Sequence, residues 1–221
     1  HSFPTRRSSD LVLHKSQEEL EMLARKKVKH LYLGIESGLD DVLKFMKKDH
    51  DLAQAYQAID RLHEAGLIYD AHIMTGVAGK GRGMENAEAL AQFLNRTNPA
   101  HVVNFSMFLH KEVPLYQDIR QGTFVPADEL ETIREEYHLI ERIAPEKAGA
   151  NILYDGFHDF IHVRVRGHLP GDKEKMLAKL NGIIQEYEGK EPVYSFVQGE
   201  CPDLEYCDDG KAVWDMDRKT S

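Results

Sequence analysis

Cysteine is nearly absent from this sequence. The chain has two cysteines in 221 residues, Cys201 and Cys207, and both lie near its end. Two thiols are too few for the disulfide framework of a small secreted protein, so a reducing compartment is the default and we predict a cytoplasmic location. Their C-x5-C spacing fits neither a zinc knuckle nor an iron–sulfur motif. We therefore predict free thiols on a polar, acidic tail.

Long apolar runs and an excess of positive charge are also lacking. No stretch approaches the ~20 apolar residues that a membrane helix needs, so no membrane association is expected. The 37 acidic residues outnumber the 28 basic ones, which gives a net charge of -9. Broad nucleic-acid binding is not expected either, because neutralising phosphates requires a basic surface.

The first eleven residues read as foreign to the protein. HSFPTRRSSDL corresponds to one reading frame of a common sequencing adapter, and segments of this kind are excluded from fold reasoning. We expect the protein proper to begin near Val12, in mid-gene, with its N-terminal part missing. The remaining residues, roughly 210, suffice for one domain or part of a larger one.

Apolar runs alternate with amphipathic segments over most of the chain. Three runs predict buried strands: HLYLGIES at 30–37, LIYDAHIMTG at 67–76 and HVVNFSMFL at 101–109. Apolar residues recur at helical spacing in three segments, 51–65, 86–95 and 128–143. Strands that alternate with helices indicate parallel strands and right-handed crossovers, hence an α/β fold that is either an open sheet or a barrel.

A glycine-rich turn follows the second apolar run, in HIMTGVAGKGRGMENA. Strand, glycine loop and helix is the layout of a phosphate-binding loop. The spacing does not fit, because Met74 stands where the first glycine of that motif belongs and Gly81 follows Lys80 where Ser or Thr is required. We interpret the turn as a strand-to-helix connection in which glycine supplies positive φ.

Three segments in the same order resemble the radical S-adenosylmethionine (radical SAM) superfamily. YLGIESGLDDVLKFMKKDH resembles its fourth-strand segment, commonly GIESGSDEVLKLMNK. HIMTGVAGKGRGMENA resembles its fifth strand and turn, and VNFSMFLHKEVPLYQDIRQGTF resembles its sixth strand with the loop that usually reads PGTPLYEEIKAGKF. The match covers residues 30–145. It implies the C-terminal half of a partial TIM-like (β/α) barrel with parallel strands and outer helices.

This resemblance also implies a division of the chain. Residues 1–11 are the adapter artefact, 12–145 the C-terminal part of the core barrel, and 146–221 a small α+β extension with an acidic tail. In the extension, HVRVRGHLPGDKEKM places two arginines and two histidines around an alternating strand. A solvated edge strand is the plainer interpretation, and a surface for substrate carboxylates or phosphates is the alternative.

The resemblance implies cofactor contacts at the carboxyl ends of the strands. Glu36 matches a polar position against the cofactor, Lys48 a basic residue near its carboxylate, and His72 a polar position on the fifth strand. Ser106 matches a contact on the sixth strand. The plainer alternatives are a helix-capping Glu36, a surface Lys48 and a core His72.

Ser37 and Gly76 complete the implied set of S-adenosylmethionine-binding residues. The turn that begins at Gly76 would lie near the adenosine end of the cofactor. Ala78 and Lys80 depart from the family there, since members usually have Pro and Glu. We expect Glu36, Ser106 and His72 to converge on one cavity at the carboxyl ends of adjacent strands, with the turn at 76–83 on its rim.

The implied activity is reductive cleavage of S-adenosylmethionine by a [4Fe–4S] cluster, which gives a 5′-deoxyadenosyl radical that abstracts hydrogen from an unidentified substrate. An electron donor such as flavodoxin or ferredoxin is implied as a partner. The resemblance is closest to members related to oxygen-independent coproporphyrinogen oxidase and to tRNA-modifying enzymes. The C-x3-C-x2-C cluster motif is missing from this chain, so we expect the ligands upstream and the chain alone to be inactive.

Two other functions stay open from the residues alone. The first is a noncatalytic α/β binding or scaffold protein that keeps the barrel without the cluster. The second is an ordinary barrel enzyme that works by acid–base catalysis, with His72 opposite Glu36 as the candidate pair.

Overall fold

The computed structural model describes residues 12, 14–196, 207–208 and 211–212. The strands are β1 (His30–Glu36), β2 (Ile68–Thr75), β3 (His101–Ser106), β4 (Ile152–His158) and β5 (Val163–Leu169). The helices are α2 (Gln17–Arg25), α3 (Asp40–Phe45), α4 (Leu52–Glu64), α5 (Gly83–Thr97), α6 (Pro114–Gln121), α7 (Glu129–Arg142) and α8 (Lys173–Tyr187). A short 3-10 helix, η1 (Asp159–Ile161), joins β4 to β5, and β6 (Cys207–Asp208) pairs with β7 (Lys211–Ala212).

Five strands form one sheet whose spatial order, β1-β2-β3-β4-β5, is also their order in the chain. The first four are parallel and β5 is antiparallel to β4. The predicted α/β fold, a partial TIM-like barrel with parallel strands, is thereby confirmed. Strand β4 was not foreseen from the sequence. It adds to the same sheet beyond residue 145, while the division of the chain at that point stays a prediction.

The helix starts follow side-chain capping. Ser16 and Glu19 form a reciprocal capping box at α2, and Asp51 does the same with Gln54 at α4. The Asp128 carboxylate accepts the first-turn N–H of α7. Helix α5 has no side-chain cap and begins at Gly83, three residues before the predicted start, because the chain enters the helix directly from the glycine turn.

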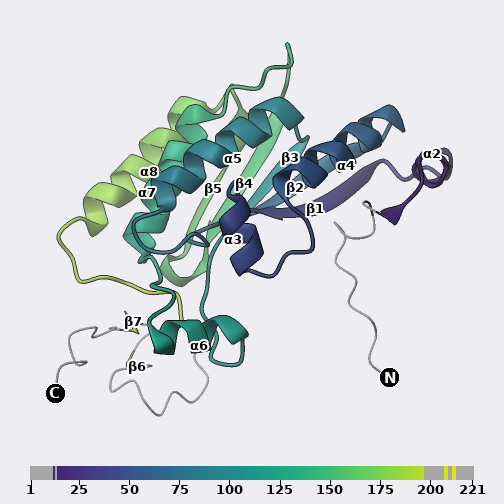
Figure 1. Ribbon diagram of the computed structural model, residues 1–221. Helices are drawn as coiled ribbons and strands as arrows, with labels where there is room; N and C mark the ends of the chain where they lie inside the picture. Colours follow the sequence, from purple (N-terminus) through teal and green to yellow (C-terminus); the bar gives the residue numbers. More distant parts are fainter. Residues whose placement is uncertain (1–11, 13, 197–206, 209–210, 213–221) are drawn as a thin grey trace.

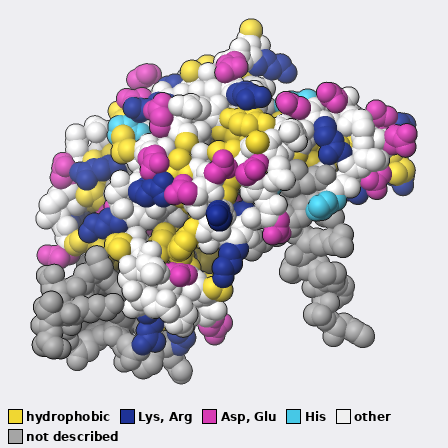
Figure 2. All heavy atoms as spheres, in the orientation of Figure 1, with side chains coloured by type: hydrophobic (Ala, Val, Ile, Leu, Met, Phe, Trp, Pro, Cys, Tyr) yellow, Lys and Arg dark blue, Asp and Glu magenta, His cyan; other side chains and the backbone are white. Residues whose placement is uncertain are grey.

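Helices α4, α5, α7 and α8 form one layer that covers a single face of the sheet (Figure 1). The main hydrophobic core lies between this layer and the strands, with fully buried side chains such as Ile59, Tyr69, Leu90 and Ile133. On the outer surface of the layer, acidic and basic side chains are interspersed (Figure 2). The helices are therefore amphipathic, as their spacing predicts. A second, smaller cluster packs α6 and the segment after β3 over the strand ends.

Three buried glutamates of α7 face the sheet and need partners, since an unpaired buried carboxylate is costly. His158, at the end of β4, lies between two of them: its Nδ1 is 3.0 Å from Glu129 Oε2 and its Nε2 is 3.0 Å from Glu136 Oε2. Asn104 and Tyr154 both donate to Glu136 Oε1, each at 3.0 Å. This network attaches α7 to β3 and β4.

The third glutamate, Glu135, ties α7 to the first two strands. It accepts hydrogen bonds from the Gly76 N–H at 2.8 Å and from Asn86 Nδ2 at 2.7 Å. Asn86 in turn accepts the Ser37 hydroxyl at 2.7 Å. Burial raises the pKa of the Glu135 carboxyl to about 7, against the two hydrogen bonds, which lower it.

The pKa of His158 is raised, whereas burial alone lowers the pKa of a histidine. Burial by itself disfavours the imidazolium, but the hydrogen bonds and charges of Glu129 and Glu136 outweigh it and raise the pKa of His158 to about 10. The charged form of His158 is therefore the one that the fold stabilises.

This arrangement predicts loss of stability in alkali. The pKa of His158 is higher in the folded chain than its ordinary value of 6.5, so its contribution is complete below pH 6.5 and is lost as pH rises toward 10. Glu135 acts in the same direction between its ordinary pKa of 4.5 and about 7. We expect the free energy of unfolding in urea to fall between pH 7 and pH 10 by more than about 1.4 kcal/mol, the equivalent of one pKa unit.

The matched variants are His158→Gln and, as a control at an exposed histidine, His14→Gln. His158→Gln should lower stability at pH 7 and flatten the alkaline dependence, whereas His14→Gln should leave both unchanged. A His158→Gln protein with the wild-type alkaline slope would contradict this assignment.

Candidate functional site

The two faces of the sheet differ in character, because side chains alternate along each strand. One face packs on the helices. The opposite face is here called the open face, and its residues are mostly half-buried or exposed. They are Tyr32, Gly34 and Glu36 on β1, Asp70, His72 and Met74 on β2, His101, Val103 and Phe105 on β3, Leu153, Asp155 and Phe157 on β4, and Arg164, Arg166 and His168 on β5. Two of the six predicted cofactor residues, Glu36 and His72, lie on this face.

Glu36 and Lys48 form an ion pair at the carboxyl end of β1. Lys48 Nζ lies 2.7 Å from Glu36 Oε1, and the two side chains are 9% and 23% exposed. The strand has a bulge between Gly34 and Glu36, and Glu36 adopts a left-handed φ of 62°. A Cβ on Gly34 would lie 2.7 Å from the Glu36 carboxylate, so a side chain at this position would displace the ends of the paired side chains. Lys48 is thus a mostly buried partner and not a solvated surface charge.

His72 lies half-buried in an aromatic setting. Its ring centroid is 5.0 Å from that of Tyr32 and 6.0 Å from that of Phe105. Burial lowers the pKa of His72, against the charge of Glu36, which raises it. His72 is therefore a neutral imidazole near pH 7, able both to donate and to accept. Glu36 takes Lys48 as its partner, so the structure does not support a Glu36–His72 acid–base pair.

The amino-terminal half of the open face holds polar atoms without partners. Asp70 is 1% exposed, and its Oδ2 lies 2.9 Å from His30 Nδ1. The Tyr32 hydroxyl lies 3.3 Å from His101 Nδ1. The other atoms of these groups, Asp70 Oδ1 and His101 Nε2, are buried and have no hydrogen-bond partner in the described part of the chain. Buried polar atoms of this kind are expected to bind water or a ligand.

Ser37 and Ser106 point away from the open face. The Ser106 hydroxyl donates to Glu129 at 3.1 Å, and Ser37 donates to Asn86. The predicted convergence of side chains is therefore wrong for Ser106, because strand alternation directs its hydroxyl into the helix layer. Both serines serve the buried network, and a contact of either with the cofactor stays a prediction.

Gly76 is held by the same network. Its φ is 82°, and a Cβ on it would lie 2.6 Å from Thr132 Cγ2, so the backbone conformation and the packing against α7 both require glycine. Gly79 and Gly81 in the same turn also have positive φ. The interpretation of this turn as a strand-to-helix connection is thereby confirmed, and its role beside a cofactor stays a prediction.

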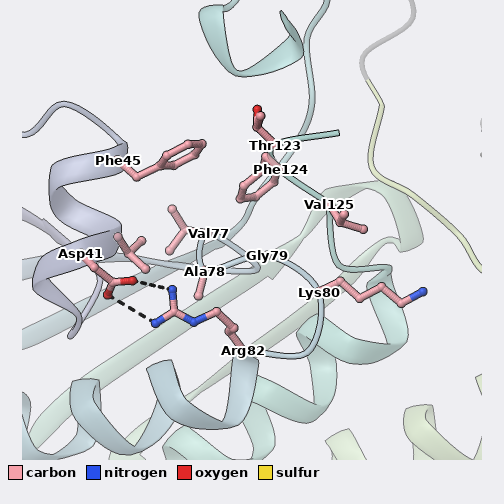
Figure 3. Close-up of a pocket in the computed structure, with 11 residues that line it drawn as sticks. Asp41, Phe45, Val77, Ala78, Gly79, Lys80, Arg82, Thr123, Phe124 and Val125 are labelled. Carbon is pink, nitrogen blue, oxygen red and sulfur yellow. Dashed lines mark hydrogen bonds and ion pairs between the residues drawn. The ribbon is translucent and has the colours of Figure 1, made fainter. Parts of the chain in front are cut away.

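A cleft of about 360 Å³ opens beside this turn (Figure 3). Phe45 and Phe124 stack at one side, with ring centroids 5.7 Å apart, and the Arg82–Asp41 ion pair lies at the other, at 2.7 Å. The Lys80 side chain extends away from the two rings. None of the six predicted cofactor residues lines this cleft, which is therefore separate from the Glu36–Lys48 pair.

Sequence reasoning missed the part of the open face on β4, which supplies the partners of the arginines already noted on β5. Asp155 binds the Arg164 guanidinium through two hydrogen bonds, of 2.8 and 2.7 Å, and Phe157 stacks on Phe105 at 5.7 Å. The available signal was the alternation of NILYDGFH, which places Leu153, Asp155 and Phe157 on one face.

No group of three or more metal-ligating side chains occurs among the described residues. Residues 12–200 contain no cysteine, so this part of the chain does not fit the thiolate ligation of a [4Fe–4S] cluster. None of the described helices is both long enough and apolar enough to cross a membrane.

Comparisons with known proteins agree with the family predicted from the three motifs. The model of the radical SAM superfamily matches residues 6–94. A tRNA uridine(34) acetyltransferase from Methanocaldococcus infernus is 25% identical over 119 residues, which are 53% of this chain and 22% of that protein. The solved structure of an N-terminally truncated Elp3 from the same archaeon aligns with a TM-score of 0.56 at 18% identity, over 77% of this chain and 39% of that one. The chain therefore spans well under half of either relative.

The Glu36–Lys48 pair gives a testable energetic coupling. Glu36→Gln and Lys48→Met should each lower the free energy of unfolding by about 1–3 kcal/mol, because each leaves a mostly buried group without its partner. The double variant should cost less than the sum of the two. Urea denaturation of the four proteins measures the coupling. Glu186→Gln, in the exposed Lys190–Glu186 pair, is the control and should change stability by less than about 0.5 kcal/mol. Strict additivity at Glu36 and Lys48 would contradict the pairing.

Proposed function

We propose that this chain, which belongs to the radical SAM superfamily, is part of an enzyme that binds S-adenosylmethionine at the carboxyl end of the open face. The observation that carries the proposal is the Glu36–Lys48 pair. It is a mostly buried charged pair at the strand end where the family motifs imply cofactor contacts. Chemistry at the carboxyl ends of parallel strands is also the rule for barrels of this kind.

The pair has unused binding capacity that suits the cofactor. Lys48 carries three N–H donors, one of which serves Glu36, and Glu36 Oε2 accepts no hydrogen bond from a described residue. S-adenosylmethionine presents a carboxylate, an ammonium group and two ribose hydroxyls. We assign Lys48 to the carboxylate and Glu36 to the hydroxyls or the ammonium group.

His72 and the aromatic groups around it complete the proposed site. A neutral imidazole provides one donor and one acceptor for polar groups of the ligand, while Tyr32 and Phe105 hold the ring in place. Asp70 Oδ1 and His101 Nε2 supply further unpartnered polar atoms on the same face. Ser37, Gly76 and Ser106 stay in the proposed set of cofactor-binding residues, although the two serine hydroxyls and the Gly76 N–H already serve the buried network.

When bound, the cofactor supplies a radical that abstracts hydrogen from the substrate, and the protein contributes orientation and shielding. The [4Fe–4S] ligands would lie upstream of this chain in the full-length protein. A flavodoxin or ferredoxin as electron donor and a cytoplasmic location belong to the same proposal. We carry over no substrate from the M. infernus acetyltransferase, because the match covers 22% of that protein.

Binding of S-adenosylmethionine tests the proposal in the full-length protein. Glu36→Gln should weaken the affinity roughly ten- to a hundred-fold, the effect of losing one hydrogen bond to a charged acceptor, while the iron content stays unchanged. Calorimetric titration with parallel iron analysis measures both, and Glu186→Gln is the control. Unchanged affinity would return Glu36 to a structural role. No binding to the wild-type protein would favour a noncatalytic α/β binding protein.

The chain of 221 residues should not form the cluster by itself. After anaerobic reconstitution with iron and sulfide, we expect none of the broad visible absorbance of an iron–sulfur protein, because two cysteines cannot replace three. Four bound irons per chain would show that other residues, or a second chain, provide the missing ligands.

A further inference from the structure

A row of flat side chains crosses β3, β4 and β5 on the open face. Phe105, Phe157 and Arg164 are direct neighbours in the strand register. The two phenyl rings stack with centroids 5.7 Å apart and an interplanar angle of 16°, and the guanidinium carbon of Arg164 lies 4.7 Å from the Phe157 centroid. Phe105 is 37% exposed. Phe157 is therefore sandwiched between Phe105 and Arg164, and the row is a partly exposed aromatic stack that ends in a cation.

The charges beside this row are not balanced. Asp155, whose side chain is 6% exposed, fixes Arg164 through two hydrogen bonds. Arg166 lies on the same face, with Nη1 at a longer 3.4 Å from the same carboxylate and a side chain that is 54% exposed. Two guanidinium groups thus share one carboxylate. Arg166 retains most of its N–H donors for another acceptor.

Protection of an edge strand does not require this arrangement. Charged residues on an edge strand discourage pairing with other chains wherever they are exposed. Here one guanidinium is both stacked on a ring and held by a bidentate carboxylate, so its position is fixed in advance. That arginine, Arg164, is committed to Asp155, so Arg166 is the guanidinium with donors left for a planar anion.

We propose that Phe105, Phe157, Arg164 and Arg166, here called the arginine–phenylalanine platform, bind a flat unsaturated ring that carries a carboxylate or a phosphate. The ring packs against the exposed part of the Phe105–Phe157 stack, and the anion accepts hydrogen bonds from Arg166. The platform shares a face with Glu36 and His72, so we assign its ligand as the substrate of the enzyme proposed above. In that assignment alone, this inference rests on the proposed function. Anion binding itself needs neither cluster nor cofactor.

Ligand-observed NMR titration of this chain tests the platform. The probes are 2-naphthoate, which carries a carboxylate, and guanosine 5′-monophosphate, which carries a phosphate. The ring-only controls are 2-naphthalenemethanol and guanosine, and the anion-only controls are acetate and inorganic phosphate. We expect at least one probe to bind more tightly than both of its controls. The probe that binds identifies the source of the anion.

The informative variants are Arg166→Gln and Phe105→Leu, since neither removes the bidentate partner of the buried Asp155. Arg166→Gln should weaken the binding of the probe roughly ten- to a hundred-fold. Phe105→Leu should weaken it about five-fold or more. Arg25→Gln is the matched control, because this exposed arginine pairs with Glu21 on α2, and it should change nothing. Circular dichroism and thermal unfolding check that each variant is folded.

Several results would overturn the platform: no binding of either probe at millimolar concentration, equal binding of ring-free anions, or unchanged affinity in folded Arg166→Gln or Phe105→Leu. Titration of S-adenosylmethionine into the full-length Arg166→Gln protein separates the two proposals. Normal cofactor binding together with lost probe binding supports both. Probe binding by a wild-type protein that does not bind S-adenosylmethionine would refute the proposed function alone.

Discussion

The fold depends on one buried histidine. Three carboxyl groups of α7 enter the sheet–helix interface, where carboxylates without partners are unstable. His158 brings a positive charge to two of them, and the remaining acceptor positions are filled by Asn104, Tyr154 and Ser106. Because the partners come from β3 and β4, the helix is fixed in register against both strands.

The same helix also determines the shape of the glycine turn. Glu135 accepts the Gly76 N–H and Asn86 Nδ2, and Asn86 holds Ser37. The ends of β1 and β2 are thus connected through α5 to α7. Glu36, one residue before Ser37, faces the opposite way and pairs with Lys48. Of these two adjacent residues, Ser37 therefore belongs to the buried network that supports the fold, and Glu36 belongs to the proposed binding site.

The sequence was most informative where periodicity was strong. Strands β1 to β3 and helices α4 and α7 all follow from the spacing of apolar residues. Strand β4 was missed because Asp155 and Gly156 interrupt its apolar run. Gly156 is explained by tertiary packing, since a Cβ there would overlap the Glu136 carboxylate, and no local pattern contains that information.

The sequence indicated which residues belong to the candidate site better than it indicated how their side chains are arranged. The motifs indicated Glu36 and Lys48 separately, but their pairing depends on a bulge and a positive φ at Glu36. Ser106 lies at the expected end of its strand, but its side chain points toward the helices and not toward the open face. Alternation along the strand decides the direction of each side chain, and position at the strand end alone does not reveal it. The arginines of β5 were evident in the sequence. Their carboxylate partner, Asp155, was not, because it lies on β4, the strand that the sequence did not predict.

The match between spatial and chain order has a consequence for synthesis on the ribosome. Each strand can pair with a neighbour that has already emerged, so the sheet can grow one strand at a time with largely local contacts. Helix α7 does not have this advantage. Glu129 and Glu136 precede their histidine by 29 and 22 residues. During that interval their carboxylates must stay hydrated, and the helix can dock fully only when the end of β4 has left the exit tunnel.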